Sequence, residues 1–207
     1  MPLDFEKQFY NQKIKYIVGC DEAGRGCLLG PVFAGAVILP KDFDCDLIND
    51  SKKLSEKQRE EAYKIIIDNA IAYGIGACSP EEIDEINILN ASRLAMERAI
   101  NNMNHKFDLI ITDYVKMPDA KVEVISPAHG DAISLCVAAA SILAKVSRDH
   151  CCYELDKKYP QYNIKSNKGY GTKDHLEALE EFGPIKGLHR FSYKPVKESL
   201  IKKITLF

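Results

Sequence analysis

Five short apolar runs of strand length constrain the fold of this chain more than any other feature of its sequence. The first two, Tyr16–Cys20 and Val32–Leu39, are separated by a glycine-rich connection from Gly24 to Pro31. The later runs alternate with segments of helical pattern and comprise Ile71–Cys78, Phe107–Thr112 and Val122–Ile125. Two adjacent early strands, followed by strands interleaved with helices, indicate a mixed α/β sheet.

The segments between these runs carry clear helix signals. Ser79-Pro80-Glu81-Glu82 combines a capping Ser, a Pro at the first helical position and acids in the first turn. Thr172 caps a later helix, which Gly183-Pro184 closes. The predicted helices run from Ser55 to about Asn69, from Ser79 through Ile86, from about Ala91 to Asn102, from Asp131 to about Lys158, and from Asp174 to Phe182.

Length and composition predict an ordinary globular chain. The 207 residues fit one domain. No apolar run reaches the ~18 residues that span a bilayer, and the first residues lack a secretory signal, so we expect a cytoplasmic protein. The seven cysteines form no C-x-x-C pair, which predicts reduced thiols. His150, Cys151 and Cys152 do not predict a zinc site, because adjacent helix residues point in different directions.

Charge is distributed unevenly along the chain. Residues 157–207 hold eleven Lys or Arg against five Asp or Glu, so this quarter carries about +6 of a net charge of −2. We therefore expect residues from about 157 to 207 to form a basic, helical C-terminal part of the single domain. A basic end beside an acidic body suits a protein that holds phosphates and gathers carboxylates for metal. The alternative is a solvated surface whose charges happen to be uneven.

Acidic residues stand at the ends of the buried strands. Asp21 and Glu22 follow the first strand, Asp113 follows the strand that ends at Thr112, and Asp131 opens the long helix. Carboxylates that converge at one edge of a sheet repel one another, and a divalent cation such as Mg²⁺ or Mn²⁺ relieves that repulsion. The pattern predicts a two-ion phosphodiester site. Taken singly, each acid is equally compatible with a surface position, and Asp131 with a helix cap.

The glycine-rich connection excludes two phosphate-binding motifs. Gly24-Arg25-Gly26 follows a strand, but a second strand comes next, whereas a dinucleotide-binding loop needs a helix there. The chain also has no G-K-[ST] sequence of a P-loop. Two interpretations remain, a tight turn or a backbone surface that approaches a ligand closely because no Cβ intervenes.

Six ordered blocks along the chain resemble the ribonuclease HII family. The first is Asp21-Glu22-Ala23-Gly24-Arg25-Gly26 with Gly30-Pro31-Val32 behind it. The others are Asp50–Leu54, Glu82–Leu89, Ala138–Asp149, Lys168–Thr172 with His175, and His189–Tyr193. The resemblance covers nearly the whole chain. It implies a ribonuclease H-like fold, with a mixed five-stranded sheet flanked by helices and a small helical C-terminal part.

The resemblance also implies roles for individual residues. Asp21, Glu22, Asp113 and Asp131 would be the catalytic metal ligands. Gly24, Arg25 and Gly26 would face the ribonucleotide, and Tyr170 would stack on the sugar of the following nucleotide. Weaker candidates for phosphate contacts are Lys52, Asn87, Asn90, Ser141 and Lys145. Three positions, in two places, depart from the family pattern: Tyr114-Val115 stand where Gly-Asn is expected, and Tyr193 where Phe is expected.

The implied activity is endonucleolytic cleavage of the RNA strand of RNA–DNA hybrids, and of duplex DNA on the 5′ side of embedded ribonucleotides. Two Mg²⁺ or Mn²⁺ ions in the substrate complex would give 3′-hydroxyl and 5′-phosphate ends. The alternatives are another nuclease on the same fold, which an all-DNA substrate discriminates, and a hybrid-binding module that does not cut, which a metal titration discriminates. The C-terminal Leu206-Phe207 faintly resembles a sliding-clamp-binding peptide, although these residues can equally dock on the body. Monomer is the default oligomeric state.

Overall fold

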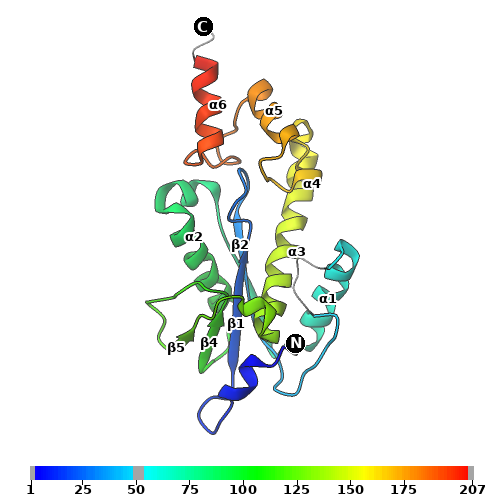
Figure 1. Cartoon of the computed structure of the whole chain (residues 1–207), viewed down its shortest axis with the longest axis vertical. Coiled ribbons are helices and arrows are strands. Elements are labelled where there is room, and N and C mark those ends of the chain that lie inside the picture. The colour runs from blue at the N-terminus through cyan, green and yellow to red at the C-terminus, as the bar shows by residue number, and fades with distance from the viewer. Residues whose placement is uncertain (1–2, 49–53, 205–207) are drawn as a thin grey trace.

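The computed structural model describes residues 3–48 and 54–204 and is built around one five-stranded mixed sheet (Figure 1). The strand order is β3-β2-β1-β4-β5. The β1–β2 and β2–β3 pairs are antiparallel, whereas β1–β4 and β4–β5 are parallel. The strands are β1 (Ile17–Ala23), β2 (Val32–Ile38), β3 (Ala72–Cys78), β4 (Leu109–Thr112) and β5 (Glu123–Ile125). The predicted mixed α/β sheet is therefore confirmed.

Two long helices cover opposite faces of this sheet (Figure 1). Helix α3 (Leu135–Lys158) packs on β1 and β2 so closely that a Cβ on Gly35 would overlap the main chain of Ala140. Helix α2 (Pro80–Asn102) packs on the other face, against β3 and β2. Helix α1 (Glu56–Asn69) lies beside α3 and buries Ala62 and Ile66 against it. Helices α1 and α3 therefore both have residues near the C-terminal end of β1.

Helix α2 joins two segments that the sequence predicts as separate helices. Ser79 and Glu82 form the predicted capping box at its start. Asn87 then adopts φ +66, which kinks the element, and its Oδ1 accepts hydrogen bonds from the N–H groups of Leu89 (3.0 Å) and Asn90 (3.2 Å). Asn87 thus caps the second half of the helix, which explains the predicted break.

The start of the long helix differs from the prediction. Helix α3 begins at Leu135, and the hydroxyl of Ser134 accepts from the N–H of Val137 to cap it. Asp131 lies in a separate 3-10 turn, η2 (Gly130–Ala132). The prediction that Asp131 opens or caps the helix is therefore wrong. Ser134, which lies nearer the apolar stripe, takes the capping position instead of Asp131.

The C-terminal part lies beyond the end of β1 and consists of short helices (Figure 1). Thr172 caps α5 and Gly183 ends it, as predicted. Buried Leu28 and Leu29 of the β1–β2 connection share an apolar cluster with Tyr162 and Val196, so this part packs directly on that connection. Its elements are η3 (Pro160–Tyr162), α4 (Ile164–Asn167), α5 (Lys173–Phe182) and α6 (Lys194–Ile204), and one further 3-10 turn, η1 (Phe5–Phe9), precedes β1.

The remaining class predictions concern membranes and cysteines. Among the helices of residues 3–48 and 54–204, none is long and apolar enough to cross a membrane. All seven cysteines are free thiols, as predicted. His150 contacts Glu60 at 2.7 Å, and the described residues hold no His, Cys, Asp and Glu group arranged for zinc.

Candidate active site

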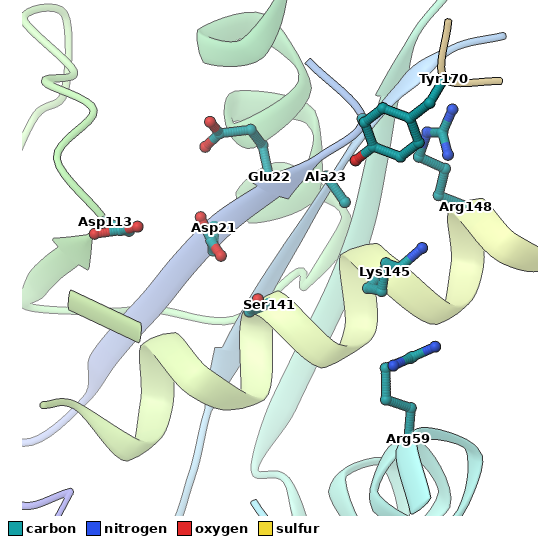
Figure 2. Close-up of a pocket in the computed structure, with 10 residues that line it drawn as sticks. Asp21, Glu22, Ala23, Arg59, Asp113, Ser141, Lys145, Arg148 and Tyr170 are labelled. Carbon is teal, nitrogen blue, oxygen red and sulfur yellow. The ribbon is translucent and has the colours of Figure 1, made fainter. Parts of the chain in front are cut away.

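A pocket of about 350 Å³ opens where β1 ends, between α3 and the C-terminal part (Figure 2). The end of β1 and the turn after it form one wall, α3 forms another, and single residues from α1, the β4 end and the loop before α5 complete it. The lining residues are Asp21, Glu22, Ala23, Gly24, Arg59, Asp113, Ser141, Lys145, Arg148 and Tyr170. The pocket thus has an acidic side and a basic side.

Asp21 and Glu22 lie within the last residues of β1, not after it as predicted. Successive side chains of a strand point to opposite faces, so the two carboxylates diverge (Figure 2). Asp21 pairs with Gly35 on the α3 face and hydrogen-bonds the hydroxyl of Ser141. Glu22 lies on the other face, where its Oε1 accepts from Nη1 of Arg25 at 3.1 Å. The strand therefore presents one acid on each side of its end.

The acidic side of the pocket carries strong unfavourable electrostatics. Burial raises the pKa of Asp21 well above its usual value, and repulsion from Glu22 and Asp113 raises it further. Burial also raises the pKa of Glu22, although the Arg25 guanidinium opposes this shift. The second oxygen of Glu22, Oε2, is buried without a hydrogen-bond partner among the described residues. These groups would gain from a bound cation.

The third and fourth predicted acids lie on neighbouring elements. Asp113 directly follows β4 and lines the pocket, and its Oδ1 accepts from the main-chain N–H of Gly130 at 2.8 Å. This bond holds turn η2, and with it the buried Asp131, next to the end of β4. Asp131 does not line the pocket itself. The structure therefore brings three of the four predicted acids, Asp21, Glu22 and Asp113, to one pocket. No three acids of the described part stand in a metal-ligating arrangement.

Lys145 and Arg148 of α3 form the basic side together with Arg59 of α1. Ser141, Lys145 and Arg148 follow one another at i, i+4 and i+7, and so lie on one helix face. Lys145 Nζ contacts Oδ1 of Asp149 at 2.6 Å. Arg59 from α1 lies 3.9 Å from the other oxygen of the same carboxylate.

Arg59 and Arg148 are pocket residues that the sequence interpretation missed. For Arg148 a signal existed, since it continues the helical stripe of Ser141 and Lys145. Nothing in the local sequence marks Arg59, because its place depends on how α1 packs against α3.

The predicted ribonucleotide-reading residues meet at the mouth of the pocket. The N–H of Cys27 donates to the carbonyl of Gly24 at 3.4 Å, which closes a tight turn over Arg25 and Gly26. Gly24 has φ +96, and a Cβ there would overlap the Arg148 side chain. A Cβ on Gly26 would lie 3.9 Å from the Tyr170 ring, so Tyr170 and the turn face the same space.

Comparison with known proteins identifies the protein family to which this chain belongs. The family model described as Ribonuclease HII matches residues 18–196. The chain belongs to the ribonuclease HII family. A ribonuclease HII of Caldanaerobacter subterraneus is 49% identical over 189 residues, which cover 91% of this chain and 78% of that protein. One of Clostridioides difficile is 48% identical over 189 residues, covering 91% and 74%.

Solved structures agree with this family and fold. Ribonuclease H2 from Pyrococcus horikoshii superimposes with a TM-score of 0.76 at 25% identity, over 90% of this chain and 98% of that one. The ribonuclease HII in a complex with PCNA from Archaeoglobus fulgidus gives 0.71 at 26% identity, over 86% and 95%. A ribonuclease HIII in complex with Mn²⁺ gives 0.71 at 15% identity, over 98% and 74%, and supports the fold alone. The chain is therefore a hydrolase, a nuclease of the ribonuclease HII family, and membership implies endoribonuclease activity on RNA–DNA hybrids.

The two departures from the ribonuclease HII pattern have structural consequences. Tyr114 adopts φ +63, a conformation that glycine takes far more readily. The N–H of Val115 donates to the Asp113 carbonyl at 2.7 Å across it, and the Tyr114 side chain is 74% exposed. The strained turn leaves the Asp113 carboxylate in the pocket. Tyr193 adds a hydroxyl, which donates to the main-chain carbonyl of Arg25 at 2.5 Å.

The weaker phosphate-contact candidates separate into two groups. Ser141 and Lys145 line the pocket, whereas Asn87 and Asn90 are exposed on α2, outside it. The Asn90 side chain accepts from Arg93 at 3.3 Å. Lys52 lies outside the described residues. Any contact from α2 would therefore involve a part of the nucleic acid that lies away from the pocket.

Proposed function

We propose that this chain cuts the RNA strand of RNA–DNA hybrids and cleaves duplex DNA on the 5′ side of embedded ribonucleotides, leaving 3′-hydroxyl and 5′-phosphate ends. One observation carries the proposal, namely that a single pocket joins an acidic side to a basic side and opens beside Gly26 and Tyr170. Cleavage of a phosphodiester uses both sides of such a pocket. Acids bind the metal ions that act on the cleaved phosphate, and basic residues bind the neighbouring phosphates of the same strand.

The acidic side fits divalent cations. Buried carboxylates with raised pKa values and an unpartnered oxygen on Glu22 are groups that a cation stabilises. Asp21, Glu22, Asp113 and Asp131 would hold two Mg²⁺ or Mn²⁺ ions, and substrate phosphate oxygens would complete the ligand set. When bound, such ions activate a water molecule and stabilise the leaving oxygen. A ribonuclease HIII of the same fold has been solved in complex with Mn²⁺.

The protein's own groups prepare this site. The Ser141 hydroxyl holds the Asp21 carboxylate on the α3 face. Arg25 holds Glu22 without nucleic acid, and we expect it to turn to the substrate once the carboxylate binds a cation. Arg59, Lys145 and Arg148 place three positive charges on that side of the pocket, where the described carboxylates include Asp149, which contacts Lys145 and Arg59, and Glu56 nearby. These cations on the pocket wall favour a phosphate there.

Selection of the ribonucleotide depends on the turn and the aromatic ring. Gly24, Arg25 and Gly26 would approach the 2′-hydroxyl, the group by which a protein distinguishes RNA from DNA. Tyr170 is 47% exposed at the mouth of the pocket and would stack on the next sugar. Lys52, Asn87 and Asn90 would contact phosphates farther along the duplex.

We also propose a monomeric single domain whose basic C-terminal part, from about residue 157, supports the substrate mouth. The complex of the Archaeoglobus protein with PCNA supports a sliding-clamp contact for this chain as well. The residues predicted for it, Leu206-Phe207, lie outside the described part. Deleting them should weaken binding to a sliding clamp while leaving cleavage of a short duplex unchanged, and equal clamp binding would remove this idea.

The deciding experiment is cleavage of a labelled duplex that carries one ribonucleotide, with Mg²⁺, Mn²⁺ or EDTA, beside all-DNA and RNA–DNA hybrid duplexes. We expect one metal-dependent cut on the 5′ side of the ribonucleotide, cleavage of the hybrid, and none of all-DNA. Cutting of all-DNA would indicate another nuclease activity. Tight binding without cutting in either metal would indicate a binding module.

A further inference from the structure

The main-chain carbonyl of Arg25, in the middle of the ribonucleotide-reading turn, is held by two side chains from the C-terminal part. Nη1 of Arg190 donates to this oxygen at 2.9 Å, across 165 positions of sequence. The Tyr193 hydroxyl donates to the same oxygen at 2.5 Å. Arg190 Nη1 also lies 3.1 Å from the Tyr193 hydroxyl, so the three groups form a closed triangle.

Arg190 fixes the far end of the β1–β2 connection as well. Its Nε and Nη2 donate to the carbonyl of Gly30 at 3.0 and 2.9 Å. The main chain adds two bonds, from Arg190 N–H to the Leu28 carbonyl (2.9 Å) and from Gly30 N–H to the Leu188 carbonyl (2.8 Å). Arg190 is fully buried. The guanidinium therefore grips the connection at Arg25 and at Gly30 and cannot move without breaking several bonds.

This grip determines where the next N–H points. A trans peptide is planar, and its C=O and N–H point in opposite directions. Because the Arg25 carbonyl points toward Arg190 and Tyr193, the N–H of Gly26 points away from them. Within the described part of the chain, that N–H has no hydrogen-bond partner. The turn thus offers a fixed, unused donor next to Tyr170.

Fixing the orientation of the Arg25–Gly26 peptide matters because the central peptide is the part of a tight turn that reorients most readily. The common four-residue turns differ mainly by a flip of the central peptide, which here joins Arg25 to Gly26. Glycine at the third position of the turn permits either orientation, since it lacks a Cβ. A flip would turn the Gly26 N–H inward and present a carbonyl oxygen to the substrate.

We infer that Arg190 and Tyr193 are positioning residues for ribonucleotide recognition, which hold the Arg25–Gly26 peptide with its N–H toward the substrate. The inference rests on the proposed function. It differs from a purely structural role in one respect, because loss of the grip lowers preference for the ribonucleotide and leaves affinity for ordinary duplex unchanged.

Tyr193→Phe tests this with a single oxygen atom. The ring of Tyr193 is only partly buried and stays in place, so we expect the variant to fold. The matched control is Tyr162→Phe, which removes another hydroxyl that donates to a main-chain carbonyl at 2.5 Å, that of Gly183. Affinities for a duplex with one ribonucleotide and for the same all-DNA duplex are measured in EDTA, and kcat/KM for the first in Mg²⁺.

In wild type we expect a clear preference for the ribonucleotide duplex. Tyr193→Phe should reduce this preference about 2–10-fold, the range expected for one hydrogen bond, with unchanged all-DNA affinity. kcat/KM should fall by the same factor. Tyr162→Phe should leave the preference unchanged. Arg190→Lys, whose ammonium cannot reproduce the fork, should reduce the preference further.

Three results would overturn the inference. They are an unchanged preference in both Tyr193→Phe and Arg190→Lys, an equal loss of affinity for both duplexes, or the same loss of preference in Tyr162→Phe. If wild type shows no preference and no cleavage, the proposed function fails and takes the inference with it. If wild type cuts correctly and only the variant result is negative, the proposed function stands and Arg190 and Tyr193 are structural alone.

Discussion

Two arginines are almost fully buried in this molecule, and their surroundings differ completely. Arg190, 0% exposed, donates from all three guanidinium nitrogens to the oxygens of Arg25, Gly30 and Tyr193. Arg148, 2% exposed, has three nitrogens without a hydrogen-bond partner in the described part. Its guanidinium lies 6.0 Å from the centre of the Tyr170 ring, on the pocket wall (Figure 2). The buried guanidinium of Arg190 is thus fully hydrogen-bonded, whereas that of Arg148, in the pocket wall, has no hydrogen-bond partner among the described residues.

The buried titratable pairs of the two regions repeat this contrast. In the pocket, Asp21 and Glu22 repel each other. In the C-terminal part, His175 and His189 belong to one chain of hydrogen bonds. The Ile185 N–H donates to Nδ1 of His189 (3.0 Å), and the Nε2 atoms of the two rings lie 3.4 Å apart. At the other end, Nδ1 of His175 donates to the Tyr170 carbonyl (2.9 Å). This chain assigns both rings as neutral. A buried polar group without a partner destabilises the folded protein unless a ligand binds it. Groups without a partner are therefore candidates for ligand binding, and groups with all their partners belong to the scaffold.

The largest effect is expected at the acidic side. Asp21→Asn should lower kcat for a ribonucleotide-containing duplex by about 10³-fold or more, because a ligand for the divalent cations is lost. The same variant should melt at a higher temperature without metal, since a repelled buried charge is removed. Steady-state cleavage and thermal unfolding measure both. Asp68→Asn on the exposed face of α1 is the control, and a wild-type rate for Asp21→Asn would refute the assignment.

In the C-terminal part, Arg190→Met should be the most destabilising change in this set. It removes both side-chain donors of the Gly30 carbonyl and one of the two donors of the Arg25 carbonyl, which keeps the Tyr193 hydroxyl. A buried unsatisfied group costs about 1–3 kcal/mol, and the lost bond to Arg25 adds to this. Urea denaturation should therefore show a free energy of unfolding lower by about 2–4 kcal/mol. A loss below about 1 kcal/mol would mean that water replaces the guanidinium and that this region is less rigid than its bonds indicate.

Arg148→Met is the matched change in the pocket wall, and we expect the opposite pattern. No hydrogen bond to a described residue is lost, so stability should stay the same or rise. Affinity for duplex should fall about 10-fold, as expected for a charged contact to phosphate, with a salt dependence shallower by about one unit. Fluorescence anisotropy at several salt concentrations measures this. Should Arg148→Met unfold as easily as Arg190→Met, the contrast between the two arginines would disappear.

The sequence predicts the satisfied and unsatisfied regions unequally well. The sequence predicts the position of Asp113 correctly, because the apolar run of β4 marks the end of that strand. The sequence places Asp131 in the wrong element, because spacing alone does not distinguish capping by Ser134 from capping by Asp131. Asp21 and Glu22 were expected to converge, but the strand continues through them and turns them to opposite faces.

Contacts between distant segments could not be predicted at all from the residues. Arg59 reaches the pocket only because α1 packs on α3. The bond from Arg190 to the Arg25 carbonyl joins positions 165 residues apart and involves a main-chain oxygen, which carries no sequence signal. The family resemblance marks His189–Tyr193 as a block without indicating that it lies under the turn.

The smallest expected effect is a difference in pH dependence between the two regions, on the order of 1 kcal/mol. Burial and repulsion raise the pKa of Asp21, so above about pH 4 the native state keeps a proton that the unfolded chain has released. This contribution to stability is lost as pH rises. Burial lowers the pKa of His189 to about 4, so the unfolded chain binds a proton first as pH falls from 6.5. That contribution is lost as pH falls.

Single variants separate these opposing slopes. In metal-free buffer between pH 4 and 6.5, Asp21→Asn removes the term that decreases with pH, so its melting temperature should rise more steeply with pH than that of wild type. His189→Gln removes the opposite term, so its melting temperature should rise less steeply, whatever its absolute stability. Added Mg²⁺ at pH 7 should stabilise wild type and His189→Gln but hardly Asp21→Asn. A melting temperature that changes equally with pH in all three proteins would contradict this prediction. An acid whose pKa is raised in the folded state must make stability depend on pH.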